Sequence, residues 1–120
     1  MIGELHKAAV VVESVAAAER FYTEVLGLEV AERIPSGTDE DYVMLRAGST
    51  TLELMPQAAM GTVPGFHHLS FKVADVDAAA AALKAQGVTM EKEPFDPLPG
   101  LRLAFFRGPD GVLLQLFQRD

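Results

Sequence analysis

A pattern of four strands and one helix occurs twice along this chain of 120 residues, and it constrains the fold more than any other feature. Residues 5–12 and residues 66–73 are apolar runs of similar length, and each is typical of a buried strand. A helical pattern follows each run, and three strand-like segments follow each helix. Because one alignment of the two halves holds from the first strand to the last, the sequence predicts two βαβββ modules.

Each predicted helix begins at a capping residue and ends at a glycine. Ser14 can cap the first helix and Asp75 the second, since short polar side chains accept hydrogen bonds from free backbone N–H groups. Gly27 and Gly87 close the helices, because glycine adopts the left-handed conformation common at helix C-termini. The apolar residues spaced for one helical face are Val15, Ala18, Tyr22 and Val25 in the first helix, and Val76, Ala79 and Leu83 in the second.

The remaining strands are predicted from short apolar segments bounded by turn residues. Residues 94–100 contain three prolines, so we expect a loop there, at the rim of a site. The Pro-Asp-Gly sequence at residues 109–111 predicts a turn before the last strand. The strands are expected at residues 29–34, 41–46 and 51–55 in the first module, and at 88–93, 101–107 and 112–118 in the second.

The alignment of the two modules pairs residues of different chemistry. Lys7 aligns with His68 and Glu53 with Gln115, provided that the first helix holds one extra residue. The predicted fold is α+β, with two βαβββ modules forming a concave, partly closed mixed sheet and with the helices on the outside. One domain is expected over residues 1–120, with module one at about 1–57, a linker at about 58–65 and module two at about 66–120.

Composition excludes several classes of function. The chain has 17 acidic and 10 basic residues, a formal charge of -7, which argues against binding to nucleic acid. It contains no cysteine, so disulfides, thiolate zinc sites and cysteine nucleophiles are excluded. Residues 1–7 do not resemble a signal peptide, and no segment has the length and apolarity of a membrane span. A cytoplasmic location is therefore expected.

The alternation of side chains along a strand predicts which residues face the site. In residues 66–73, His68, Ser70 and Lys72 share one face, whereas His67 belongs to the face that meets the helix. The apolar row on the helix side consists of Leu69, Phe71 and Val73.

The same reasoning places polar groups from three other strands. Glu53 lies opposite the apolar row of its strand, and Gln115 is an amide among apolar neighbours that needs a partner. The first strand is apolar on both faces, so only its alignment with His68 places Lys7. We expect Lys7, Glu53, His68 and Gln115 on the concave face.

Three segments of the chain resemble the vicinal oxygen chelate superfamily, the fold of glyoxalase, bleomycin-resistance proteins and extradiol dioxygenases. Residues 12–30, with Glu-Arg-Phe-Tyr-Thr-Glu-Val-Leu-Gly-Leu, are similar to its first helix and second strand. The His-His-Leu-Ser-Phe sequence at residues 67–71 is similar to the start of its second module, and residues 108–116 to its closing hairpin. The resemblance covers essentially the whole chain.

The resemblance implies a divalent metal site, holding Zn, Ni, Mn or Fe. Carried over position by position, the metal ligands are Glu53, His68 and Gln115, and the catalytic positions are Glu53 and Gln115. From their expected place on the concave face and from the aromatic residues of the chain, we expect Lys7, Ser70 and Phe105 to contact the ligand. An amide at position 115 can coordinate through its carbonyl oxygen but cannot transfer a proton as a base.

Lys7 stands where the metal-dependent members of this superfamily have a histidine ligand. A protonated lysine has no lone pair to donate and repels a cation. His6 could replace it only if a bulge turned the strand by one residue. The ammonium of Lys7 and the carboxylate of Glu53 are then expected to form an ion pair, and His68 could simply be a polar side chain facing a wet cleft.

Two functions remain open from the sequence. The first is a glyoxalase-like lyase or isomerase acting on a small oxygenated metabolite. The alternative is a metal-independent protein that binds a small molecule or an antibiotic without catalysis, like the bleomycin-resistance proteins. A dioxygenase ranks third, because its iron triad needs two histidines. A homodimer is expected. The aromatic residues that suit a flat or cationic ligand are Tyr42, Phe95, Phe105 and Phe106.

Overall fold

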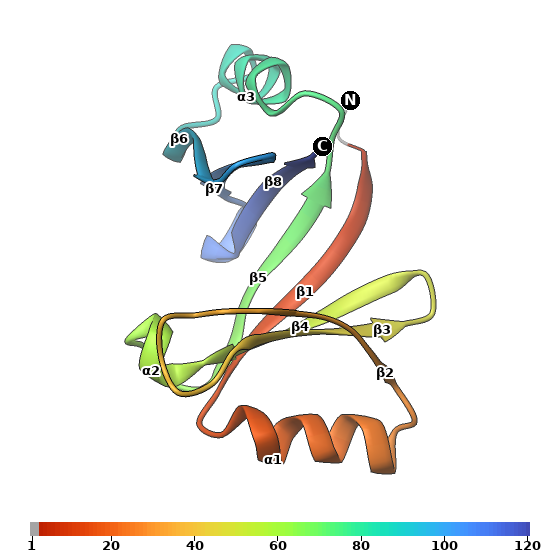
Figure 1. The fold of residues 1–120 in the computed structure, drawn as a ribbon. Helices are drawn as coiled ribbons and strands as arrows, with labels where there is room; N and C mark the ends of the chain where they lie inside the picture. The colour runs from red at the N-terminus through yellow and green to blue at the C-terminus, as the bar shows by residue number, and fades with distance from the viewer. Residues whose placement is uncertain (1–2) are drawn as a thin grey trace. The chain divides into compact units, whose positions relative to one another are not determined.

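The computed structural model describes residues 3–120, except for the side chain of Asp110. Met1 and Ile2, the start of the segment compared with a signal peptide, lie outside the described residues. Figure 1 shows the elements, which are β1 (Glu4–Val12), α1 (Val15–Arg20) continued by a π-helical turn (Phe21–Val25), β2 (Glu29–Ile34), β3 (Tyr42–Ala47), β4 (Thr50–Pro56), α2 (Gln57–Met60), β5 (Gly65–Lys72), α3 (Val76–Ala85), β6 (Met90–Leu98), β7 (Leu101–Arg107), a 3₁₀ turn (Pro109–Gly111) and β8 (Leu113–Arg119).

The chain forms two compact units. The first unit is Lys7–His67, and the second is His68–Asp120 together with the residues before Lys7. In the first unit the strand order is β2-β3-β4-β1, and in the second it is β5-β8-β7-β6. β1 and β4 are parallel, as are β5 and β8, whereas the other neighbours are antiparallel. The predicted α+β fold with two βαβββ modules is therefore confirmed.

The registers around the fourth strand of each unit match. Glu53 lies opposite Ala9 on β1 and opposite Met44 on β3. Gln115 lies opposite Ser70 on β5 and opposite Phe105 on β7. β4 and β8 thus pair with their two neighbours in the same offset, so the alignment of Glu53 with Gln115 predicted from the sequence is confirmed.

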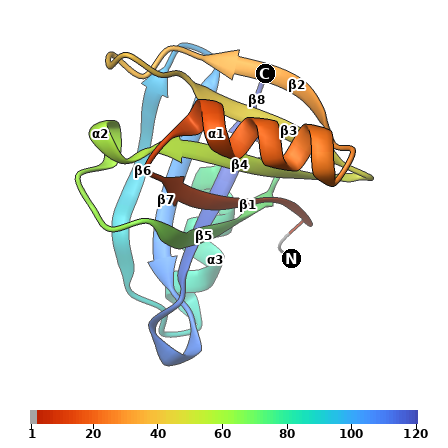
Figure 2. The same cartoon turned by 90° about the horizontal axis from the view of Figure 1, so that it is seen from below.

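The first helix is capped from two directions. The Ser14 hydroxyl accepts a hydrogen bond from the Ala17 N–H at 3.1 Å. The Glu40 carboxylate accepts from the backbone N–H groups of Val15 and Ala16, at 2.7 and 2.9 Å. These bonds satisfy N–H groups that have no partner within the helix. α1 lies along β3 and β4, where Val15 is buried (Figure 2).

The one extra residue of the first helix is accommodated in the π-helical turn. The Leu26 N–H donates to the Phe21 carbonyl, a bond over five residues instead of four. A π-helical turn holds one residue more than an α-helical turn, so Gly27 still ends this segment with a positive φ of 76°. The widened turn also rotates Val25 away from the sheet, and this residue is 67% exposed. Its predicted place on the buried stripe was wrong.

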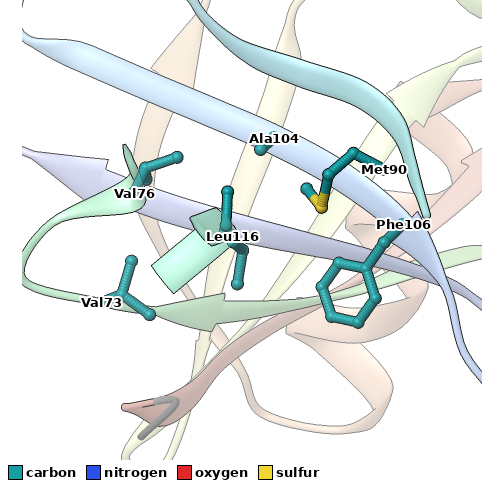
Figure 3. Close-up of a cluster of buried hydrophobic side chains, with 7 residues drawn as sticks. Val73, Val76, Met90, Ala104, Phe106 and Leu116 are labelled. Atoms are coloured by element: carbon teal, nitrogen blue, oxygen red, sulfur yellow. The ribbon is translucent and has the colours of Figure 1, made fainter. Parts of the chain in front are cut away.

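The second helix packs as the sequence predicts. The Asp75 carboxylate caps it by accepting from the Ala78 N–H, and α3 contacts β6, β7 and β8. Figure 3 shows the cluster that Val76 of α3 forms with Leu116 of β8, Met90 of β6, and Ala104 and Phe106 of β7. The buried members of this core are Val73, Val76, Ala80, Met90, Ala104, Phe106 and Leu116.

The loop predicted at residues 94–100 is largely a strand. β6 continues to Leu98, and only Pro99 and Gly100 form the turn into β7. β6 is the last strand in the order of its unit, so Pro94 and Pro97 need not donate to a further strand. Its register against β7 also shifts three times, and such bulges tolerate proline.

The segment predicted as a linker contains one short helix, α2, directly after β4. Residues 61–64 then lead into β5. Within residues 3–120, no helix is long and apolar enough to cross a membrane.

Candidate ligand-binding residues

Lys7 and Glu53 form an ion pair on the sheet of the first unit. The Lys7 ammonium nitrogen lies 2.9 Å from Glu53 Oε1, and the side chains are only 6% and 9% exposed. Glu53 alternates with Leu54, which packs with Val15 of α1, so the pair lies on the face opposite that helix.

The surroundings of this ion pair are mostly apolar. Ala9, Met44 and Met55 are buried on the same face. Tyr42 shares this face, and its hydroxyl is 3.8 Å from the Met60 sulfur. Burial raises the pKa of the Tyr42 phenol, and the negative charge of Glu53 raises it further. Removing one charge of the pair would leave the other poorly solvated.

The second unit buries three polar side chains on one face of its sheet. His68, Ser70 and Gln115 are 4%, 0% and 3% exposed. Ser70 and Gln115 are direct neighbours across β5 and β8. Leu116, the residue after Gln115 on β8, belongs to the core beside α3. Because side chains alternate along a strand, Gln115 and its neighbours His68 and Ser70 lie on the opposite face, as does Phe105, which precedes Phe106 of that core.

An aromatic contact joins β5 and β7 on this face. The rings of His68 and Phe105 meet edge to face, with centroids 5.8 Å apart and planes at 86°. β5 and β7 flank β8 on either side, so their backbones are about 9.6 Å apart, twice the usual spacing between strands. The two rings therefore meet across β8, on the face that carries Gln115.

Two buried atoms of this face have no hydrogen-bond partner within the described residues. They are Ser70 Oγ and Gln115 Oε1. Leaving a buried polar atom unsatisfied costs about 1–3 kcal/mol, and most native proteins avoid it. A bound group with polar atoms would offset this cost.

The aromatic surface extends from Phe105 towards the edge of the sheet. Phe95 of β6 stacks on Phe105, with centroids 6.3 Å apart. The Lys92 ammonium lies 4.0 Å above the Phe95 ring, a cation–π contact. Phe106 is not part of this surface, because it is the neighbour of Phe105 along the strand and lies in the α3 core. Its predicted ligand role is therefore corrected.

The bulge that could bring His6 into the Lys7 position is absent from the described ladder. β1 pairs with β4 without a shift from Lys7 to Val12. The His6 ring instead stacks on Phe117, with centroids 4.3 Å apart. His67 is half-buried, less so than its neighbour His68.

The side chains present do not form an ordinary metal centre. Among residues 3–120, no three His, Asp or Glu side chains are grouped as a metal ion requires. The one carboxylate predicted as a ligand, Glu53, is already bonded to the Lys7 ammonium. Gln115 offers only a neutral carbonyl oxygen. The predicted set of Glu53, His68 and Gln115 thus lacks the donors that a divalent ion usually needs.

Some functional contacts were not foreseen from the sequence. Glu40 lies between β2 and β3, and its carboxylate caps α1. Gln118 caps α3, accepting from the Val76 N–H at 2.8 Å. Both contacts join residues 25 or more positions apart, and no local sequence signal predicts them.

Comparison with known families gives a match over nearly the whole chain. The family model described as "Glyoxalase/Bleomycin resistance protein/Dioxygenase superfamily" matches residues 4–116.

Two kinds of relatives have names that describe an activity. A 2-epi-5-epi-valiolone epimerase from an Actinomyces species is 35% identical, over 93% of this chain and 77% of the relative. The mitochondrial methylmalonyl-CoA epimerase of Mus musculus is 29% identical, over 98% of this chain and 74% of the relative. The uncharacterised protein YaeR of Escherichia coli is 27% identical, over 97% of this chain and 96% of the relative.

Solved structures share the fold. A hypothetical protein from Bacillus halodurans superposes with a TM-score of 0.83 at 21% identity, over 98% of this chain and 94% of the other. A variant of Streptomyces coelicolor methylmalonyl-CoA epimerase, in complex with 2-nitronate-propionyl-CoA, has a TM-score of 0.78 at 25% identity, over 98% and 97%.

Proposed function

Because the chain belongs to the Glyoxalase/Bleomycin resistance protein/Dioxygenase superfamily, we propose that it binds a small oxygenated metabolite on the sheet of the second unit and isomerises it. The observation that carries this proposal is the pair of buried, unpartnered atoms Ser70 Oγ and Gln115 Oε1. Such atoms are costly in a protein that binds nothing at that place, and they suit a ligand with polar groups.

The relatives favour an isomerase over the lyase that the sequence also allowed. The curated relatives named above with a stated activity are epimerases, and their names give two different compounds. An epimerase inverts a carbon centre, which requires that a proton leave one face and return to the other. The substrate itself is not implied by these names, since members of one fold act on many substrates.

The chain offers groups for such a proton transfer. A base removes a proton from the carbon beside a carbonyl, and a cation or hydrogen-bond donor stabilises the negative oxygen that results. We propose that His68 transfers the proton at the face of the second unit, where Ser70, Gln115 and Phe105 would orient the ligand. Glu53, the base predicted from the sequence, belongs to the first unit and is bonded to the Lys7 ammonium there, so its catalytic role stays a prediction.

No step of this proposal uses a metal ion. Superfamily resemblance implies one, but the residues present do not supply its donor set, and Lys7 brings a fixed positive charge to Glu53. The proposal is a metal-independent reaction.

A second candidate is ligand binding without catalysis. It is favoured by one observation, that Glu53 is bonded to Lys7 while the equivalent position of the second unit is the amide Gln115. Neither position then holds a free carboxylate base. The homodimer and the cytoplasmic location stay predictions under either function.

Exchange of substrate protons with solvent distinguishes the two candidates. The protein is incubated in D₂O with methylmalonyl-CoA or 2-epi-5-epi-valiolone, the compounds named by its relatives, and the proton beside the carbonyl is followed by NMR. We expect faster loss of that signal than without protein, and no acceleration with His68→Ala. Saturable binding with no acceleration for either compound would favour the binding protein instead.

A further inference from the structure

We propose that Ser70 and Gln115 form a subsite for a hydroxyl group, so that the ligand is a hydroxylated compound whose O–H donates to Gln115 Oε1. This inference rests on the proposed function and names the chemistry of the ligand. It starts from the two unpartnered atoms of the second unit, which are 0% and 3% exposed by residue.

The two side chains are placed to contact one small group. Ser70 and Gln115 are opposite one another on neighbouring parallel strands, about 4.8 Å apart, with both side chains on the same face. A hydroxyl between them can donate its hydrogen to Gln115 Oε1 and accept the hydrogen of the Ser70 hydroxyl. One group thereby satisfies both atoms.

Other polar groups fit this pair less well. A carboxylate oxygen can accept from Ser70, but it has no hydrogen for Gln115 Oε1 and repels it. An ammonium group donates to both atoms but would carry a charge into a site closed to solvent. A hydroxyl is neutral and both donates and accepts.

The first unit provides an internal comparison. At the equivalent positions it has Ala9 and Glu53, and the carboxylate is bonded to Lys7 within the same unit. The polar group of the first unit therefore has a partner inside the chain, whereas Gln115 Oε1 has none among the described residues. The same fold can fill this position internally, so the lack of a partner for Gln115 Oε1 among the described residues is a property of these residues and not of the fold.

Phe105 adds a second feature of the ligand. Gln115 on β8 lies between Ser70 on β5 and Phe105 on β7. An aromatic ring therefore lies next to the hydroxyl subsite. The apolar face of a carbon ring can stack on Phe105 while one of its hydroxyls reaches Gln115. A hydroxylated ring combines both properties.

The first test needs no ligand. The double variant Ser70→Ala, Gln115→Met removes both unpartnered atoms and keeps a similar side-chain volume. If the atoms are reserved for a ligand, the free protein should become more stable, with Tm raised by about 3 °C or more. The matched control is Gln118→Met on the same strand, whose amide caps α3 and whose loss should lower Tm. A lower Tm for the double variant would show that the pair serves folding, and would overturn the inference.

The second test uses two probes of opposite hydrogen-bonding character. Myo-inositol offers hydroxyls on a ring, and malonate offers only acceptors. We expect myo-inositol to shift the side-chain amide signal of Gln115 in a saturable way, and malonate to leave it unchanged. The shift should be lost in Gln115→Met and weakened at least fivefold in affinity in Ser70→Ala, by the loss of one hydrogen bond.

The outcomes separate the inference from the proposed function. If malonate shifts the signal and myo-inositol does not, the hydroxyl subsite is wrong while a ligand site at this face stands. If myo-inositol has no effect, the inference is overturned whatever the stability of the double variant. If neither probe binds and the double variant is less stable, the ligand site of the second unit is wrong as well.

Discussion

The Lys7 ammonium lies 2.9 Å from the Glu53 carboxylate, and this ion pair is almost closed to solvent. Its carboxylate occupies the same place in its module as Gln115 does in the second. One module thus carries a charge with an internal partner, and the other a neutral amide whose Oε1 has no hydrogen-bond partner among the described residues. The two positions differ in what they can do, even though β4 and β8 pair with their neighbours in the same register.

Breaking the ion pair should destabilise the protein. Lys7→Met leaves Glu53 charged among apolar neighbours, and we expect a loss of about 3 kcal/mol in the free energy of unfolding. Urea denaturation at neutral pH measures this loss. The double variant Lys7→Met, Glu53→Met should regain most of it, because no charge remains buried.

The matched control for this prediction is an exposed ion pair. Lys84 is bonded to Glu93 with both side chains about half exposed, so Lys84→Met should cost less than about 1 kcal/mol. Equal losses for Lys7→Met and Lys84→Met would contradict the account of the buried pair.

Replacing the lysine tests whether its positive charge keeps a metal ion away from Glu53. Lys7→His exchanges an ammonium for a metal ligand. We expect Ni²⁺ or Zn²⁺ to raise the Tm of this variant and not that of the wild type, after both have been treated with a chelator. In Lys7→His, Glu53→Gln the metal effect should disappear, because the carboxylate next to the new histidine is lost. A wild type that binds one divalent ion tightly would contradict the metal-independent proposal.

The long-range cap of α1 should be visible in stability. Glu40→Ala removes the carboxylate that accepts from Val15 and Ala16, and we expect a loss of about 1–2 kcal/mol. Glu40→Gln should lose less, since an amide oxygen still accepts one bond. Thermal or urea unfolding of the three proteins gives the order, and an unchanged stability of Glu40→Ala would contradict the capping role.

The bond between Glu19 and Arg33 should contribute to the pH dependence of stability. The side-chain hydrogen bonds from Arg33 hold the pKa of Glu19 below its ordinary value of 4.5. The stabilisation is therefore present above pH 4.5 and is lost as the pH falls through the lowered pKa. Glu19→Gln should show a smaller loss of Tm over this acid range, and the effect should be small because the pair is near the surface. An identical acid profile for both proteins would show that the pair contributes nothing.

Most of the fold could be predicted because the βαβββ pattern occurs twice in the sequence. The registers around Glu53 and Gln115 confirm the alignment, and both helix caps were found from short polar residues before apolar stripes. Alternation along β7 places Phe105 and Phe106 on opposite faces of the sheet, although the sequence predicted that both suit a ligand. The exposure of Val25 was missed, since no periodic pattern reveals a π-helical turn.

The candidate site could be predicted only in part. The sequence placed Lys7 with Glu53 and foresaw that Gln115 would need a partner. It could not show that Ser70 also lacks one, because the direction of a hydroxyl depends on neighbours from another strand. The strand through Pro94 and Pro97 was missed for a similar reason, since only the edge position of β6 makes proline tolerable.

The central claim is that the buried polar face of the second unit orients a substrate for proton transfer. The most direct measurement compares solvent-deuterium exchange of the substrate proton for the wild type and for Gln115→Met at saturating substrate. We predict accelerated exchange by the wild type and at least a tenfold slower exchange by the variant, which should remain folded with an unchanged or higher Tm. Equal exchange rates for the two proteins, or no acceleration by the wild type, would contradict the claim.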